Sequence, residues 1–163
     1  MFYYSRNVIN IAANVNVHSG AIEQAILSFP AVAEATVVGI PDTLKGQLPF
    51  AFIHLRHNND ENCPATPDVR LFDSINGAVR EQIGAIASLG GIIQGPSGMF
   101  PRTRSGKTLR LVLRQLVENG VRADYNAEIE VPSTVENVEA VDVARERVKE
   151  YFVEKRKRQA KEA

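Results

Sequence analysis

Apolar side chains recur every three or four residues in four segments of the chain, and this spacing predicts an α-helix in each. The first helix begins with Ser19 as its N-cap, has Glu23 in its first turn and ends at Pro30. The second opens at Thr66-Pro67-Asp68, and the third runs from residue 108 to Asn119-Gly120. The last begins at Ser133-Thr134-Val135-Glu136, which has the form of a capping box. The apolar stripes are Ala21, Ile22, Ala25, Ile26 and Phe29; Phe72, Ile75, Val79, Ile83 and Ile86; Leu109, Val112, Leu113, Leu116 and Val117; and Val141, Ala144, Val148, Tyr151 and Phe152.

Strands are predicted between the first two helices and before the third. Residues 32–40 are rich in β-branched side chains, and residues 48–55 form a second strand after a turn at 41–47. This short connection favours antiparallel pairing, and residues 90–94 provide a short third strand. The order predicts an α+β fold, with a mixed or antiparallel three-stranded sheet flanked by helices and a basic C-terminal helix. We expect one domain over residues 5–130, followed by a C-terminal helix and basic tail over 131–163.

Composition narrows the function classes. The 163 residues carry 19 basic and 19 acidic side chains, so no overall positive field favours nucleic acid. An RNA-binding or nuclear-localisation role for Lys155–Arg158 is the less favoured alternative, because a solvated, fraying tail is the commoner origin of such a run of charges. No run of 18 apolar residues predicts a membrane span, and no signal peptide is recognisable. The single cysteine, Cys63, is expected to be a surface thiol in a reducing compartment. We therefore expect an intracellular protein of the cytoplasm or mitochondrial matrix.

The segment Pro101-Arg102-Thr103-Arg104-Ser105-Gly106-Lys107 is the strongest functional signal. Three cations surround a Ser-Gly pair directly before a helix, so a lysine ammonium lies on a loop that can approach and leave a phosphate. A P-loop is the first alternative, because the segment ends like G-x-x-x-x-G-K-[ST]. The leading glycine of that motif is replaced by Pro101, which has no N–H to offer a phosphate. An ordinary basic loop before a helix is the second alternative.

The pattern P-x-T-x-S-G-K-x-x-R resembles the C-terminal lysine motif of the adenylate-forming superfamily of acyl- and aryl-CoA synthetases. The stretch 37–42, Val-Val-Gly-Ile-Pro-Asp, and the stretch 44–49, Leu-Lys-Gly-Gln-Leu-Pro, extend the resemblance. Residues 79–84 and 131–134 are similar to the acetyl- and propionyl-CoA synthetase branch. The resemblance covers about residues 5–150 and only the C-terminal domain of such an enzyme. It implies a partner, the N-terminal adenylation domain, that holds most of the ATP and carboxylate pocket.

The resemblance also implies roles for individual residues. Lys107 would be catalytic, stabilising charge on the α-phosphate while a carboxylate attacks ATP, and Ser105 and Gly106 would let its loop move. Arg80 matches an arginine that approaches a phosphate of CoA, although it could equally be a surface arginine. ATP and CoA would be substrates, and Mg²⁺ would be bound by the N-terminal domain. No metal site is predicted on this chain, because His18, His54 and His57 lack a ligand pattern.

The chain departs from the family pattern near its start. Arg6 lies where the family has its hinge residue. Ala13 replaces a glycine past which pantetheine threads, and Asn14 and Asn16 lie in the same CoA-binding interval. These substitutions keep a second hypothesis open, in which the chain is a free-standing, non-catalytic fragment or an interaction module with the same fold.

Overall fold

The computed structural model describes residues 8–11, 15–44, 46–57 and 63–162, and its centre is a three-stranded mixed sheet. Strands β3 (Val32–Asp42) and β4 (Gly46–Leu55) are antiparallel, and β5 (Gly91–Gln94) lies parallel to β4. The strand order is β3-β4-β5. The expected α+β fold is confirmed, and of the two expected alternatives, a mixed or an antiparallel sheet, the structure has the mixed one.

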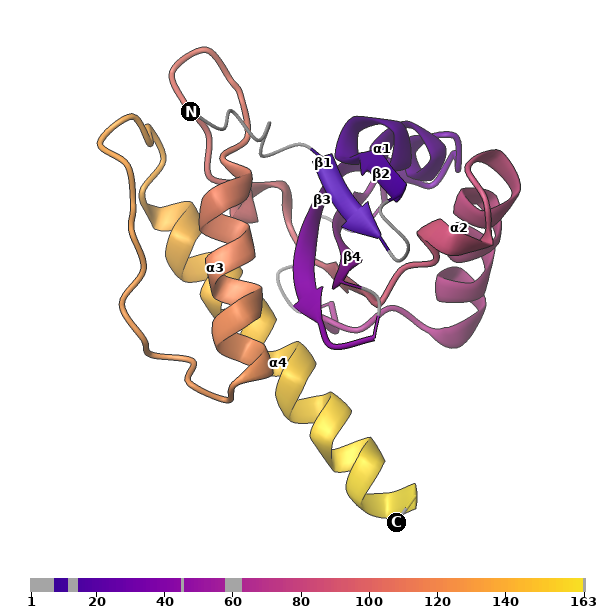
Figure 1. Cartoon of the computed structure of the whole chain (residues 1–163). Coiled ribbons are helices and arrows are strands. Elements are labelled where there is room, and N and C mark those ends of the chain that lie inside the picture. Colours follow the sequence, from indigo (N-terminus) through magenta and orange to yellow (C-terminus); the bar gives the residue numbers. More distant parts are fainter. Residues whose placement is uncertain (1–7, 12–14, 45, 58–62, 163) are drawn as a thin grey trace.

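Helices cover both faces of this sheet (Figure 1). The strands supply alternate residues to two cores. Helices α1 (Ser19–Leu27) and α2 (Val69–Gln82) cover one face, where Val37, Ala51 and Ile92 are fully buried or nearly so. Helices α3 (Arg110–Val121) and α4 (Glu139–Glu162) cover the other, where Val38 and Phe52 are buried. Successive strand residues point to opposite faces, so a sheet buried on both sides reads as a continuous apolar run.

A second, two-stranded sheet was not predicted. Strand β1 (Val8–Ile11) pairs antiparallel with β2 (Val15–His18), and Ile9 is 2% exposed against the core under α1. Each strand has only four residues, so their alternation is too short to predict the pairing from the sequence.

The helix starts differ from the sequence expectations. His18 is the N-cap of α1, and Ser19 is a buried helical residue without a hydrogen bond for its Oγ among the described residues. Glu23 lies beyond the first turn of α1. Asp68, not Thr66, caps α2, and its Oδ1 accepts a hydrogen bond of 2.8 Å from the amide of Leu71. Short 3₁₀ turns at Ala85–Ala87 and Ser97–Met99 complete the described elements.

The capping-box prediction for the last helix was wrong. Helix α4 begins at Glu139, and the Glu136 amide donates to the carbonyl of Arg102 instead of starting a helix. The predicted apolar face is confirmed, because Val141, Ala144 and Val148 are buried against the sheet and α3. Near the far end, Arg156 donates to the carbonyls of Gly120 and Val121, which are the last acceptors of α3. The boundary at residue 130 stays a prediction.

Cys63 is buried, contrary to the surface position expected from its polar neighbours. The buried guanidinium of Arg147 donates to the carbonyl of Cys63 and lies 3.5 Å from its Sγ. Helix α4 therefore holds Cys63 in place through a contact 84 residues away in sequence, which local composition does not reveal.

Within the residues that the structure describes, no helix combines the length and apolar character needed to cross a membrane.

Candidate functional site

The lysine motif folds into a tight turn, which we call the lysine loop (residues 101–109). The amide of Thr103 donates to the carbonyl of Lys107 at 2.9 Å, and the amide of Gly106 donates to the carbonyl of Thr103 at 2.8 Å. Gly106 has φ +86°, which a residue with a side chain adopts only under strain. The Ser-Gly pair therefore makes a sharp turn between two short arms of the loop, residues 101–103 and 107–109. Lys107 lies on the second arm.

Arg102 holds the first arm of this loop to the domain. Its guanidinium forms an ion pair with Glu34 on β3, and its Nη1 lies 3.4 Å from the hydroxyl of Thr108. Arg102 and Thr108 also face one another in an isolated antiparallel bridge. The base of the loop is closed by its own backbone and tied to the sheet.

Arg110 holds the second arm, where α3 begins. Its Nη2 lies 2.7 Å and 2.6 Å from the two carboxylate oxygens of Glu23 on α1, and its Nε lies 2.9 Å from Oε1. The amide of Val37 on β3 donates to the same Oε1 at 3.0 Å. Glu23 is only 8% exposed, so this charge is largely removed from water and depends on its partners. The pair joins α1, β3 and α3 directly behind the loop.

The tip of the lysine loop borders an open hollow of about 620 Å³. Arg104, Ser105 and Lys107 line it from the loop, while Ser133 and Glu136 line it from the segment before α4. Lys107 is exposed, and its Nζ has no hydrogen bond or ion pair with any described residue. The arrangement presents a free ammonium outward from a well-anchored base, where it can meet an anion held by another surface.

The structure separates Lys107 from the predicted CoA-binding arginine. Arg80 is exposed in the last turn of α2, on the other side of the sheet from α3 (Figure 1). The backbone of Asn16 lies in β2 opposite Asn10. Arg6, Ala13 and Asn14, also predicted to act in hinge motion or CoA binding, lie outside the described residues.

The histidines form no common site among the described residues. His18 is an exposed N-cap, whereas His54 is buried and its Nδ1 lies 3.0 Å from the carbonyl of Gly95, to which it donates. In the described ranges, no three His, Cys, Asp or Glu side chains gather closely enough to hold a metal ion.

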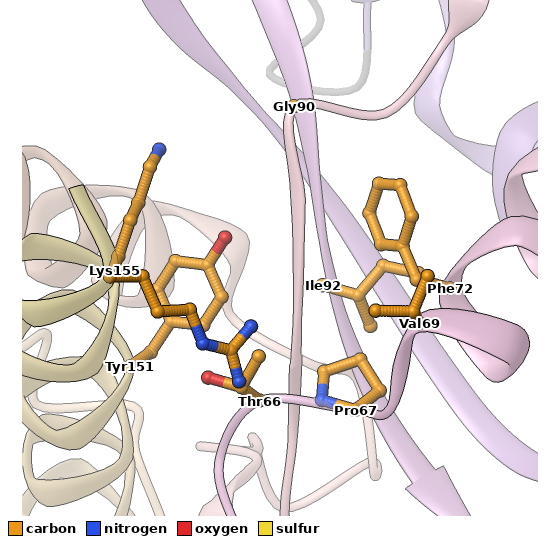
Figure 2. A pocket seen from close by; sticks show the side chains of 9 residues that line it. Thr66, Pro67, Val69, Phe72, Gly90, Ile92, Tyr151 and Lys155 are labelled. Atoms are coloured by element: carbon orange, nitrogen blue, oxygen red, sulfur yellow. The ribbon is translucent and has the colours of Figure 1, made fainter. Parts of the chain in front are cut away.

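A second hollow, of about 240 Å³, lies between α2 and α4 above β5 (Figure 2). Pro67, Val69 and Phe72 form one wall, and Tyr151 and Lys155 of α4 face them. Burial raises the pKa of the Tyr151 hydroxyl, and the nearby positive charge of Arg158 partly opposes this shift. The lysine loop contributes no residue to this hollow.

The residues behind and beside the loop were not recognised as part of a site from the sequence. Glu23 was interpreted as a helix-dipole partner, and Ser133–Glu136 as a helix start. Arg110 was recognisable as the last fixed position of the lysine motif. Its partner, Glu23, lies 87 residues earlier and therefore could not be paired with it from the sequence.

Known proteins resemble this chain in sequence. The family model described as AMP-binding enzyme C-terminal domain matches residues 21–107, from α1 to the lysine. The chain is 37% identical to the acetyl-coenzyme A synthetase of Bartonella henselae over 121 residues, which are 72% of this chain and 17% of that protein. It is 36% identical to the acetyl-coenzyme A synthetase of Novosphingobium aromaticivorans over 141 residues, or 84% of this chain and 20% of that protein. The chain thus spans about a fifth of the length of these relatives.

Solved structures show the same fold. The acyl-CoA synthetase of Brucella canis matches with a TM-score of 0.57 and 30% identity, over 66% of this chain and 18% of that one. The protein MatB of Rhodopseudomonas palustris matches with a TM-score of 0.57 and 22% identity, over 70% of this chain and 20% of that one. The second likeness concerns the fold alone.

Proposed function

Because the chain belongs to the family of AMP-binding enzyme C-terminal domains, we propose that it serves an AMP-forming short-chain acyl-CoA synthetase. The overall reaction would join acetate or propionate to CoA, with ATP converted to AMP and pyrophosphate. Support for the acid and the thiol comes from relatives named acetyl-coenzyme A synthetase. The single observation that carries the proposal is the exposed ammonium of Lys107, unpaired among the described residues, on a loop that is anchored on both arms.

Lys107 is the proposed catalytic residue of the first half-reaction. A carboxylate oxygen attacks the α-phosphorus of ATP, the bond to the pyrophosphate oxygen breaks, and acyl-AMP and pyrophosphate form. Negative charge concentrates on the α-phosphate oxygens during this displacement. An ammonium directed at these oxygens in a closed site can lower the barrier by about 3–4 kcal/mol. The exposed position of Lys107 fits this role, because another domain must supply the closed environment.

The second half-reaction would use the other side of the sheet. CoA sulfur attacks the acyl carbonyl of acyl-AMP, the bond to the AMP oxygen breaks, and the thiol proton is released. Arg80, at the C-terminal end of α2, is the proposed contact for a CoA phosphate. Since Arg80 and the lysine loop lie on different sides of the sheet, the domain would rotate between the two half-reactions. Ser105 and Gly106 would allow the loop to adjust as Lys107 leaves.

The proposed partner is the N-terminal adenylation domain, which would hold ATP and the acid. The described residues do not provide a cluster that fits Mg²⁺, and no step proposed for this chain uses a metal. Arg6, Ala13, Asn14 and Asn16 remain proposed hinge and CoA contacts.

The test combines this chain with the N-terminal adenylation domain of an acetyl-CoA synthetase. Acyl-AMP formation is measured from ATP and acetate, and thioester formation from preformed acetyl-AMP and CoA. We expect Lys107→Ala to lower acyl-AMP formation by about 10²–10³-fold and to spare thioester formation. Lys149→Ala, an exposed lysine on α4, should change neither rate.

Two outcomes would overturn the proposal. Equal losses in both half-reactions would refute the assigned role of Lys107. No activity with the folded wild-type chain would favour the alternative, a non-catalytic module with the same fold.

A further inference from the structure

The segment Ser133–Asn137 lies against the first arm of the lysine loop, and we call it the brace. Val135 faces Thr103 in an isolated antiparallel bridge and is 7% exposed. The amide of Glu136 donates to the carbonyl of Arg102 at 2.8 Å. The brace therefore pairs with the loop as a short strand would, although the two segments are distant in sequence.

The side chain of Asn137 extends this pairing. Its Oδ1 accepts a hydrogen bond of 2.7 Å from the amide of Arg102, and its Nδ2 donates to the carbonyl of Phe100 at 2.9 Å. One carboxamide thus pairs with both the carbonyl of Phe100 and the amide of Arg102, two residues apart on the same side of the first arm. The carbonyl of Asn137 accepts from the amide of Ala140 at 2.9 Å, which links the brace to the first turn of α4.

Arg102 is consequently held at its amide, its carbonyl and its guanidinium. After Arg102, the hydrogen bond from the Thr103 amide to the Lys107 carbonyl closes the turn. Because the turn is closed by its own backbone hydrogen bonds, the direction in which Lys107 points away from the domain depends on where the first arm is fixed. The geometry points to Asn137 as a positioning residue for Lys107.

The brace is also part of the hollow beside Lys107. Ser133, Thr134 and Glu136 line it together with the loop. The ion pair between Arg104 and Glu136 is long, at 3.9 Å, and both side chains are mostly exposed, so it adds little to the attachment. Hydrogen bonds from Asn137 and the brace backbone therefore carry the positioning. All of these brace residues lie beyond residues 21–107, the part that the family model matches.

This inference rests on the proposed function for its catalytic consequence, but the attachment itself can be measured separately. Amide hydrogen exchange of the whole chain reports it by NMR. In Asn137→Ala, the amides of Arg102 and Glu136 should exchange about tenfold faster or more, while that of Leu116 in α3 stays protected. Asn137→Asp keeps the acceptor but places an oxygen against the Phe100 carbonyl, so its effect should be intermediate. Asn126→Ala is the matched control, because Asn126 is exposed in the same connection between α3 and α4.

The catalytic consequence is measured with the N-terminal adenylation domain added. Asn137→Ala should lower kcat for acyl-AMP formation by about 10–100-fold, since a displaced reacting group loses alignment. The KM for ATP and thioester formation from preformed acetyl-AMP should change by less than about threefold. A purely structural role would lower both half-reactions together.

Each result separates the two claims. An unchanged exchange rate of the Arg102 amide in Asn137→Ala would refute the claim that Asn137 attaches the brace to the loop. Faster exchange with an unchanged half-reaction ratio would overturn the positioning role. Faster exchange in a chain whose wild type forms no acyl-AMP would support the brace and refute the proposed function.

Discussion

The ion pair between Glu23 and Arg110 provides the most direct test of how this domain is held together. The side chain of Glu23 is 11% exposed and that of Arg110 is 20% exposed, and they meet through contacts of 2.6–2.9 Å. Removing one partner of a buried ion pair takes away the charge that offsets the desolvation of the other, which costs about 3–5 kcal/mol. Because some water reaches Arg110, we expect the lower end, about 3 kcal/mol.

For a chain of 163 residues, this loss corresponds to a fall in Tm of about 6–12 °C. The assay is thermal and urea unfolding of Glu23→Gln, Arg110→Met and the double variant. The glutamine side chain in the first variant can still accept from the amide of Val37, so the loss reports mainly the charge interaction.

The double variant should be less destabilised than the sum of the single variants, with a coupling energy of about 2 kcal/mol. Glu154→Gln is the control, because the pair between Glu154 and Arg158 is about half exposed and should contribute less than about 1 kcal/mol. Additive single effects, each below about 1 kcal/mol, would refute the reasoning.

Two further predictions concern single groups. Gly106→Ala should destabilise the chain by about 1 kcal/mol because its φ is +86°, although among the described residues only its chain neighbours lie within 4 Å of the added Cβ. Gly98→Ala is equally uncrowded there but has no positive φ, so it should not destabilise the chain. Equal Tm values for the two variants would contradict the strain argument. The raised pKa of Tyr151 means that the unfolded chain loses this proton first, so the free energy of unfolding should fall as the pH rises above about 10. Tyr151→Phe should remove that part of the pH dependence in urea titrations, and an unchanged alkaline slope would show that Tyr151 does not cause it.

Much of the fold follows from local patterns. The apolar stripe of α3 and the β-branched run of β3 each specify an element within a few residues, because side chains every three or four residues, or in alternation, must share a face. The lysine loop is equally local, since Gly106 permits its turn and Pro101 ends the preceding segment. These features need only neighbouring residues, and the sequence therefore predicts them.

Other features depend on which segments meet. Whether Ser133–Glu136 starts a helix or pairs with the lysine loop depends on the carbonyl of Arg102, which competes for the Glu136 amide. The buried position of Cys63 depends on Arg147, and the role of Glu23 depends on Arg110. A capping box, a polar loop and a first-turn acid are each reasonable interpretations until the distant partner is known.

The sequence therefore sets most of the elements and places Lys107 on a loop directly before a helix, because backbone preference and hydrophobic spacing act over a few residues. It does not determine the direction in which the lysine loop presents Lys107. Packing of α3 and α4 on one face of the sheet brings Asn137 to the loop, and burial of Glu23 beside Arg110 makes their charges interdependent. Hydrogen bonds and ion pairs between distant residues form only when the two cores are assembled, so the geometry around the lysine is a property of the folded domain.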